Sequence, residues 1–152
     1  MPLRFFLAGI MQGSHVEALL HGQDYRAQLK RLLAEHFRGA VVYDPLADHA
    51  NSLAYDDATA REVFLRHNRI SGEIDVLLAF LPEASMGTAI EMWEAHRHGA
   101  VVISITPMKH NWAVKFLSHE VYADLEEFEA AVRTGQLARR IDEIRAPGAP
   151  QS

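Results

Sequence analysis

The chain has 152 residues, a formal net charge of −5 and no cysteine. Its length suits one domain with a substantial core, and its hydrophobic share of 49% is ordinary for a globular protein. The negative charge gives no electrostatic basis for binding nucleic acid or an acidic membrane. The lack of cysteine excludes disulfides, thiolate metal sites and cysteine nucleophiles. No apolar run approaches the roughly 18 residues that cross a membrane, so we expect a cytoplasmic protein.

Short apolar runs alternate along the chain with segments of helical period. Strands are expected at residues 3–9, 40–46, 74–82, 100–107 and 120–123. Helices are expected at 25–37, about 57–71, about 87–99, 111–119 and across 124–144. Residues 11–22 are polar and flanked by glycine, which is typical of a loop.

Strands separated by helices of this length require crossover connections, which join parallel neighbours. We therefore predict an α/β fold: a doubly wound, Rossmann-like or flavodoxin-like, parallel five-stranded sheet with helices on both faces. Residues 1–144 should form a single domain. The segment 145–152 is rich in Pro, Gly and Ser, so we expect a disordered tail.

In a doubly wound sheet, ligands bind at the carboxyl ends of the strands. After the first strand, Gly9 and Gly13 would allow a tight turn and the close approach of a ligand to the backbone. This segment is neither G-x-G-x-x-G nor a Walker motif, so neither a classical dinucleotide site nor an ATPase is indicated, and no cofactor is expected. The nine histidines are scattered, and no metal site is expected.

The segment after the third strand allows two interpretations. Thr88 and Glu91 have the spacing of a capping box, in which both side chains only close a helix start. Alternatively, Ser85, Gly87 and Thr88 surround free N–H groups that bind a phosphate. Glu91, one turn further on, would then face a sugar attached to that phosphate. A carboxylate in that position is suited to nucleophilic attack on an anomeric carbon.

Four motifs together resemble the nucleoside 2-deoxyribosyltransferase-like family, which contains nucleoside deoxyribosyltransferases and nucleoside 5′-monophosphate N-glycosidases. The motifs are FLAG (6–9), IDVLLAF (74–80), SMGTAIEMWEA (85–95) and GAVVISI (99–105). The most specific element is a strand followed by Ser/Asp-x-Gly-Thr-x-x-Glu. The resemblance implies the same α/β fold and an activity on the N-glycosidic bond.

The resemblance also implies roles for individual residues. Glu91 looks like the glutamate that attacks C1′ and holds the glycosyl group covalently. Ser85 stands where the transferases carry Asp and the monophosphate hydrolases carry Ser, which favours a 5′-phosphate. The loop with Gly9, Met11, Gln12 and Gly13 is similar to the one that contacts phosphate and base, although Gln12 replaces the Arg of some members.

Two positions depart from the family pattern. Phe6 stands where the family has a tyrosine that can hydrogen-bond the nucleophile or the sugar. The family's helix Asp, which helps the base to leave, is replaced by His67 or Asn68. His67 is a candidate general acid, because its ordinary pKa is near neutrality. It is equally well explained as a surface histidine, in which case the protein would bind but not cleave.

Two further residues lie at expected strand ends. Asp44 is a candidate ligand contact, although Asp before Pro45 is also ordinary turn chemistry. Asn111, with Lys109 nearby, is a second candidate ligand contact. It could reach the ligand across a subunit interface, because the resembled enzymes are dimers or larger oligomers whose sites include residues of a neighbouring subunit. The simpler interpretation of both Asn111 and Lys109 is a surface loop.

The leading hypothesis is an enzyme that cleaves the N-glycosidic bond of a nucleoside 5′-monophosphate or a nucleoside through Glu91, by hydrolysis or by deoxyribosyl transfer. Its partners would be a small nucleotide or nucleoside and further copies of itself. One alternative is a non-catalytic module on the same fold that binds a nucleotide or an ADP-ribose derivative. Another is an oligomeric scaffold with no ligand.

Overall fold

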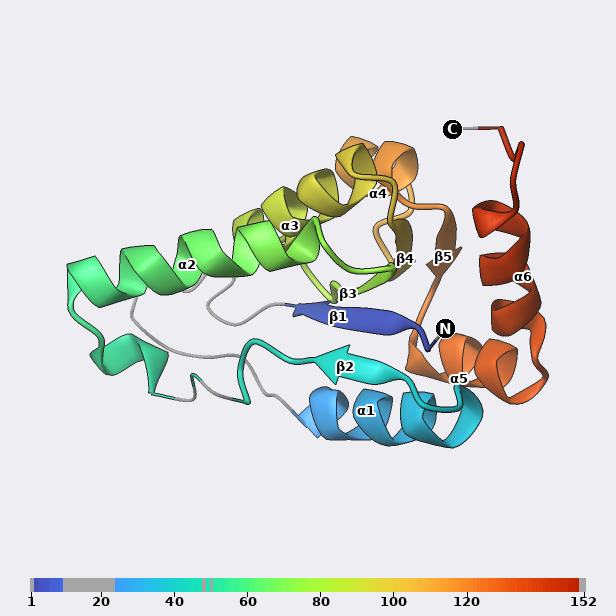
Figure 1. Cartoon of the computed structure of the whole chain (residues 1–152), viewed down its shortest axis with the longest axis horizontal. Coiled ribbons are helices and arrows are strands. Elements are labelled where there is room, and N and C mark those ends of the chain that lie inside the picture. Colours follow the sequence, from blue (N-terminus) through green and yellow to red (C-terminus); the bar gives the residue numbers. More distant parts are fainter. Residues whose placement is uncertain (1, 10–23, 48, 50, 151–152) are drawn as a thin grey trace.

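The computed structural model of the chain describes residues 2–9, 24–47, 49 and 51–150 (Figure 1). A single five-stranded sheet with the order β2-β1-β3-β4-β5 forms its centre, and every neighbouring pair is parallel. The strands are β1 (Arg4–Gly9), β2 (Val41–Tyr43), β3 (Val76–Phe80), β4 (Val101–Ile105) and β5 (Glu120–Tyr122). This topology confirms the predicted α/β fold.

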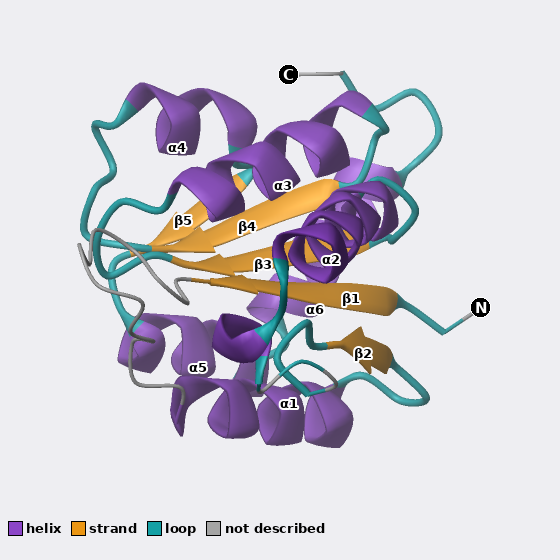
Figure 2. Cartoon of the chain, turned by 90° about the vertical axis from the view of Figure 1, so that its left-hand side faces the viewer, coloured by secondary structure: helices purple, strands orange, loops and turns teal. Residues whose placement is uncertain are grey.

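The connecting segments are helical and cover both faces of the sheet (Figure 2). The helices are α1 (Asp24–His36), α2 (Asp57–Ser71), α3 (Met86–Arg97), α4 (Trp112–Leu117), α5 (Leu125–Arg133) and α6 (Gln136–Arg145), with a short 3-10 turn, η1 (Ser52–Ala54). Side chains of α1, α5 and α6 pack on one face of the sheet, and side chains of α2, α3 and α4 pack on the other.

Alternation along β1 shows how one strand supplies both cores. Phe5 and Leu7 point to the face covered by α1, whereas Phe6 and Ala8 point to the α3 face, and all four are buried. A strand buried on both faces is expected to be apolar at nearly every position, as β3 is; β1 and β4 depart from this only at Arg4 and Ser104.

Three predicted elements need correction. The strand expected over 40–46 is only Val41–Tyr43, and it lies at the edge of the sheet with Val41 exposed. The helical region expected over 124–144 is two helices separated at Gly135, which adopts a left-handed conformation with φ of 75°. The last of these helices extends to Arg145, so that residue does not belong to a tail.

The carboxylate of Asp75 joins three segments at the amino edge of the sheet. It accepts hydrogen bonds from the backbone N–H of Arg4 at 2.8 Å and from its guanidinium, and it pairs with Arg145 of α6 at 3.0 Å. Burial alone would raise the pKa of Asp75, but the bonds from Arg4 and Arg145 outweigh it and lower the pKa to about 2. Asp75 therefore fixes the start of β3.

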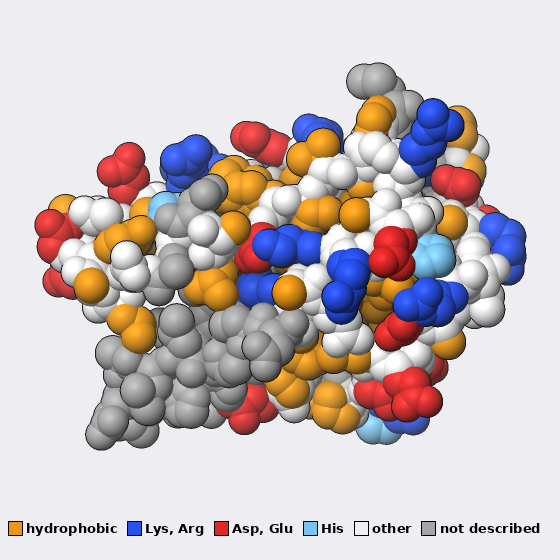
Figure 3. Space-filling model, turned by 90° about the horizontal axis from the view of Figure 1, so that it is seen from below, with side chains coloured by type: hydrophobic (Ala, Val, Ile, Leu, Met, Phe, Trp, Pro, Cys, Tyr) orange, Lys and Arg blue, Asp and Glu red, His pale blue; other side chains and the backbone are white. Residues whose placement is uncertain are grey.

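Two surface properties bear on possible partners. On the face covered by α1 and α5, side chains of both charges are interspersed (Figure 3). Among the described residues, no helix has the length and hydropathy needed to span a bilayer.

Candidate active site

Helix α3 begins at the carboxyl end of β3, and Ser85 caps it. The Ser85 hydroxyl accepts a hydrogen bond from the backbone N–H of Thr88 at 3.3 Å and donates one to the Thr88 hydroxyl at 3.0 Å. The cap is therefore three residues earlier than a Thr88–Glu91 capping box requires, and that interpretation is wrong. No described residue comes within 4 Å of the position of a Cβ built on Gly87, so the helix start faces open space.

Glu91 lies in the second turn of α3 and is not involved in capping. The residue as a whole is partly exposed, but its carboxyl group is surrounded by protein atoms. Burial raises the pKa of Glu91 to about 8, and the nearby positive charge of Arg26 opposes this rise only in part. A carboxyl group whose pKa is raised by desolvation at a strand end is characteristic of a functional site.

Arg26 of α1 is the buried cation of this region. Its Nη1 donates to the carbonyl of Leu7 in β1 at 3.2 Å and to Oδ1 of Asp44 at 2.9 Å. Asp44 also pairs with Lys30 at 3.2 Å and accepts a hydrogen bond from the N–H of Leu46 at 3.0 Å. Asp44 therefore closes the turn after β2, as its place before Pro45 suggested, and it holds the buried guanidinium between the ends of β1 and β2.

Tyr25 lies over the end of β1. A Cβ at Gly9 would come within 3.0 Å of the Tyr25 ring carbon Cζ, and the Tyr25 ring contacts that of Phe80 with centroids 4.2 Å apart. Among the described residues, Gly9 therefore makes room for the Tyr25 side chain. The Tyr25 hydroxyl is buried beside the Arg26 side chain. Burial raises the pKa of Tyr25 to about 12; the charge of Arg26 opposes this rise, and the charges of Asp44 and then Glu91 add to it.

His67 of α2 is buried in a cluster of rings on the other side of the same edge. Its ring lies 6.0 Å from that of Tyr43 and 5.2 Å from that of His49, and its Nε2 has no hydrogen-bond partner within the described part of the chain. Burial, followed by the charges of His49 and two arginines, lowers the pKa of His67 to about 4. His67 is therefore neutral at neutral pH and is not a surface histidine.

Two cavities bordered by described residues differ in their position on the sheet. One of about 440 Å³ lies at the carboxyl edge, next to Phe80, Pro82 and Thr106, so it adjoins the Tyr25 ring through Phe80. Its volume is in the range of small-molecule sites.

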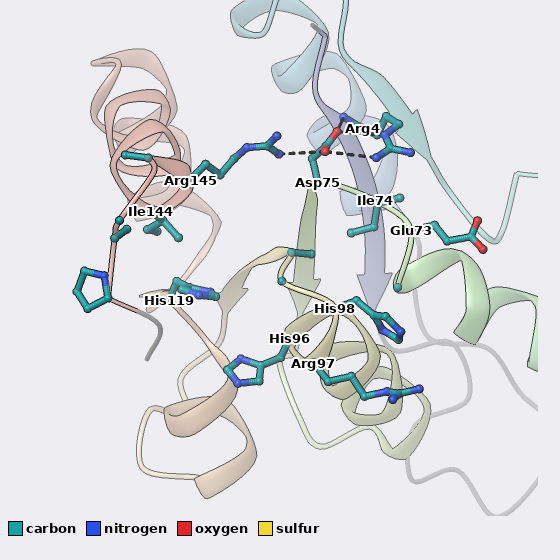
Figure 4. Close-up of a pocket in the computed structure, with 17 residues that line it drawn as sticks. Arg4, Glu73, Ile74, Asp75, His96, Arg97, His98, His119, Ile144 and Arg145 are labelled. Atoms are coloured by element: carbon teal, nitrogen blue, oxygen red, sulfur yellow. Dashed lines mark hydrogen bonds and ion pairs between the residues drawn. The ribbon is translucent and has the colours of Figure 1, made fainter.

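A second cavity, of about 830 Å³, opens at the amino edge (Figure 4). Its arginines are already engaged: Arg4 and Arg145 pair with Asp75, and Arg97 pairs with Glu94. Because it lies at the opposite end of the strands from Glu91, it is not the candidate active site.

The remaining predicted residues divide into three groups. Phe6 is fully buried, and its ring stacks on that of Tyr43 with centroids 5.3 Å apart, so it belongs to the core on the α3 side of the sheet. The side chain of Asn111 accepts hydrogen bonds from the N–H groups of Ala113 and Val114 and caps α4. Met11, Gln12 and Gly13 lie outside the described residues.

Two residues of the site, Tyr25 and Arg26, were not predicted from the sequence. Arg26 stands three residues before Leu29 and seven before Leu33, so it falls on the buried stripe of α1. A charged residue on such a stripe is rarely buried without a partner. That position is the signal by which Arg26 could have been found.

The five parallel strands in the order 2-1-3-4-5, with helices on both faces, form a doubly wound α/β fold, and a solved 2-deoxyribosyltransferase has the same fold. No family model matches the sequence, and no curated protein matches it significantly.

Solved structures provide the particular comparisons. A 2-deoxyribosyltransferase from the psychrotolerant bacterium Bacillus psychrosaccharolyticus superimposes with a TM-score of 0.58 at 16% identity, over 83% of this chain and 90% of that one. A conserved protein from Enterococcus faecalis V583 superimposes with a TM-score of 0.60 at 17% identity, over 88% and 99%. At identities this low, the structural similarity shows a shared fold, and the chemistry has to be argued from the site residues.

Proposed function

We propose that this protein cleaves the N-glycosidic bond of a nucleoside 5′-monophosphate or a nucleoside, with Glu91 as the nucleophile. The observation that carries the proposal is the buried carboxyl group of Glu91, one turn beyond an open helix start at the carboxyl edge of the sheet. This edge is where doubly wound folds bind their ligands. The likeness to a 2-deoxyribosyltransferase supports the same chemistry.

In the proposed reaction a carboxylate oxygen of Glu91 forms a bond to C1′ of the sugar. The bond between C1′ and the base nitrogen breaks, and its electron pair leaves with the base, which takes up a proton. Water, or the nitrogen of a second base, then attacks C1′ and releases Glu91. Water as acceptor gives a glycosidase, and a second base gives a transferase.

The first step requires Glu91 in its ionised form. With a pKa of about 8, roughly nine in ten Glu91 side chains are protonated at pH 7. Arg26 favours the carboxylate, because a nearby positive charge stabilises it in the low dielectric of a buried site. We therefore assign Arg26 the role of keeping Glu91 ionisable, and kcat/KM should rise with pH through about 8.

The sugar 5′ end would lie at the start of α3. The N–H groups of the first turn and the partial positive charge of the helix end attract an anion. Ser85 already bonds Thr88, so the hydroxyls fix the shape of the helix start, and Gly87 leaves room for a phosphate. In this arrangement Glu91 faces the sugar from the same helix.

His67 remains a candidate for assisting departure of the base. Because its pKa is lowered to about 4, the resting group is a neutral imidazole. A neutral ring donates a hydrogen bond from one nitrogen and accepts one at the other, so it would position the base. Protonation of the leaving base would then fall mainly to water.

The experiment is incubation with a panel of ribo- and deoxyribonucleoside 5′-monophosphates and nucleosides at pH 7 and 8.5, with free base measured by chromatography. Glu91→Gln should lower the rate on the order of 10³-fold. Glu94→Gln, on the same helix but in a surface pair with Arg97, is the matched control and should stay near wild type. The proposal is wrong if no substrate releases base, or if Glu91→Gln releases it at the wild-type rate.

A second candidate function is a non-catalytic nucleotide-binding module. The neutral, buried His67 favours it, because a resting imidazolium is not available as a general acid. Nucleotides would then raise the melting temperature of wild type and of Glu91→Gln alike, with no base released from either. Assembly into a dimer or a larger oligomer and a cytoplasmic location are further parts of the proposal.

A further inference from the structure

The cavity at the amino edge of the sheet, which we call the amino-edge cavity, is lined by more basic than acidic side chains. Its volume of about 830 Å³ lies within the range of small-molecule sites. Six of its lining residues are basic and two are acidic. The basic residues are Arg4, Arg97, Arg145, His96, His98 and His119. Because the whole chain carries a net charge of −5, this gathering of basic groups is a local feature that requires an explanation.

Two of the six basic side chains are used within their own helix. Arg97 pairs with Glu94 at 3.0 Å, and Nδ1 of His98 donates to the backbone carbonyl of Glu94 at 2.8 Å. Basic residues are common at the C-terminal end of a helix, where they balance the partial negative charge of its carbonyl groups. This explains the position of Arg97 and His98 at the end of α3, so we give them no further role.

Arg4 and Arg145 hold more hydrogen-bond donors than their shared partner can use. Both pair with the carboxylate of Asp75, so these three side chains together carry one net positive charge. The side chain of Glu73, the other acidic residue of the cavity, points away from Asp75 (Figure 4). A guanidinium group has five N–H donors. Arg145 contacts Asp75 through Nη1 and Arg4 through Nε and Nη2, so within the described part of the chain both keep donors for a further anion.

His96 and His119 lie side by side at the same cavity (Figure 4), with ring centroids 6.1 Å apart. Burial lowers the pKa of His119, and Nδ1 of its neutral ring accepts a hydrogen bond from the backbone N–H of Val102 at 3.0 Å. The proton of this ring is therefore on Nε2, which is left as a donor. Nδ1 of His96 is buried and has no hydrogen-bond partner among the described residues. A buried polar atom of this kind indicates a missing ligand, ion or water.

An apolar wall comes from the last part of the chain. Ile144 of α6 contributes to it, followed by Ala146, Gly148, Ala149 and Pro150. The N–H of Ala149 donates to the carbonyl of Ala146 at 3.1 Å, so the chain makes a tight turn directly after α6. A ligand in the cavity would therefore meet charged donors on one side and aliphatic surface on another.

We propose that the amino-edge cavity binds a small organic anion that carries at least two negative charges on phosphate or carboxylate groups. Its oxygens would accept hydrogen bonds from the guanidinium groups of Arg4 and Arg145, whose planar donors suit both groups. A dianion is favoured over a monoanion because it can engage both guanidinium groups at once. Nε2 of His119 would supply a further donor, and the apolar part of the ligand would pack against Ile144 and Pro150.

Helix α3 joins the amino-edge cavity to the candidate active site. Ser85 caps the helix at the carboxyl edge of the sheet, and His98, its C-cap, lines the cavity. A bound anion would thus lie against the far end of the helix that carries Glu91. The inference does not depend on the proposed reaction, because none of the residues assigned to this site takes part in it.

Calorimetric titration with sodium pyrophosphate, and separately with citrate, tests the site at pH 7 and low ionic strength. Both titrations use Gly87→Asp as the parent protein, because its carboxylate repels anions from the start of α3 and a Cβ at this position meets no described residue. One anion should bind per chain, and the probe that binds more tightly identifies the preferred group. Arg145→Gln should raise the dissociation constant on the order of 10-fold, through the loss of a charge-assisted hydrogen bond. Arg139→Gln, which removes the same charge from an exposed position on α6, is the matched control and should bind as the parent does.

A second measurement locates the bound anion without relying on the arginines. Trp112→Phe leaves Trp93 as the only tryptophan, and its ring stacks on that of His96 with centroids 6.5 Å apart. The Trp93 fluorescence should therefore change along the same binding curve as the heat. The proposal is overturned if neither probe binds, or if Arg139→Gln weakens binding as much as Arg145→Gln does. Constant Trp93 fluorescence while an anion binds would place that anion elsewhere and overturn it as well.

Discussion

Replacing Glu91 by glutamine should make the protein more stable at neutral and alkaline pH, whatever reaction the site performs. The folded protein binds the Glu91 proton more tightly than the unfolded chain does, because burial raises the pKa from 4.5 to about 8. Ionising the carboxyl group therefore costs folding free energy. The carboxamide of glutamine has nearly the same shape and no proton to lose.

The magnitude follows from the two pKa values. Below pH 4.5 both the folded and the unfolded carboxyl groups are protonated, so the two proteins differ only by a constant amount. Between pH 4.5 and 8 only the folded state keeps the proton, and the wild-type free energy of unfolding falls by about 1.4 kcal/mol per pH unit relative to the variant. The advantage of Glu91→Gln should thus reach on the order of 3–5 kcal/mol by pH 9.

Urea unfolding followed by circular dichroism at pH 5, 6, 7, 8 and 9 measures this difference for both proteins. Comparison with the variant at each pH cancels every other titrating group, including His67. Glu94→Gln, the same substitution in a surface pair with Arg97 on the same helix, is the matched control. A difference between Glu91→Gln and wild type that does not change with pH would refute the assignment of a buried carboxyl group.

Three further substitutions probe the surroundings of Glu91. Arg26→Met should destabilise the protein by about 3 kcal/mol in the same urea titration, because the buried carboxylate of Asp44 then keeps only the exposed Lys30 as a partner. Lys30→Met should cost less than about 1 kcal/mol, because Arg26 still pairs with Asp44. Gly9→Ala should lower the free energy of unfolding by about 1–3 kcal/mol, because the added methyl group meets the Tyr25 ring. In a double-mutant cycle, Tyr25→Leu should remove much of this cost. If the effects of the two substitutions simply add, the contact is contradicted. Because the pKa of His67 is lowered to about 4, only the unfolded chain takes up a proton at this residue between pH 6.5 and 4, and the free energy of unfolding falls as the pH falls through this range. His67→Phe should flatten that part of the acid unfolding curve. An unchanged curve would argue against a buried imidazole.

The fold was predictable because buried parallel strands have a clear signature. The apolar runs of β1, β3 and β4 are recognisable as buried strands in the sequence alone. The helix expected at about 57–71 is confirmed as α2. β2 was overestimated because the apolar start of 40–46 does not reveal that the strand lies at an edge, where a few residues suffice. The break at Gly135 was missed although the helical period changes there: Phe128, Ala131 and Val132 of α5 and Leu137 and Ile141 of α6 would not share one face of a continuous helix.

The candidate site was predictable only where local spacing defines it. Ser85, Gly87 and Glu91 lie on one continuous segment, so sequence motifs could assign them to one group. Tyr25 and Arg26 reach the same edge from a helix that precedes β2, and only the packing of α1 on the sheet reveals this. The hydrophobic period of α1 does not show that these two residues lie near the segment that carries Glu91. The roles of the residues grouped around Glu91 remain predictions for the experiments above.

The ion pairs of Asp75 have a consequence for the order in which the chain folds during synthesis. Arg4 is made 71 residues before Asp75, so it can bond this carboxylate as soon as β3 has left the ribosome. Arg145 follows 70 residues later, by which time β1 and β3 can already be paired. The second guanidinium therefore secures a sheet that exists before it arrives. Changes at Arg145 should accordingly speed unfolding of the finished protein and leave the rate of folding almost unaffected.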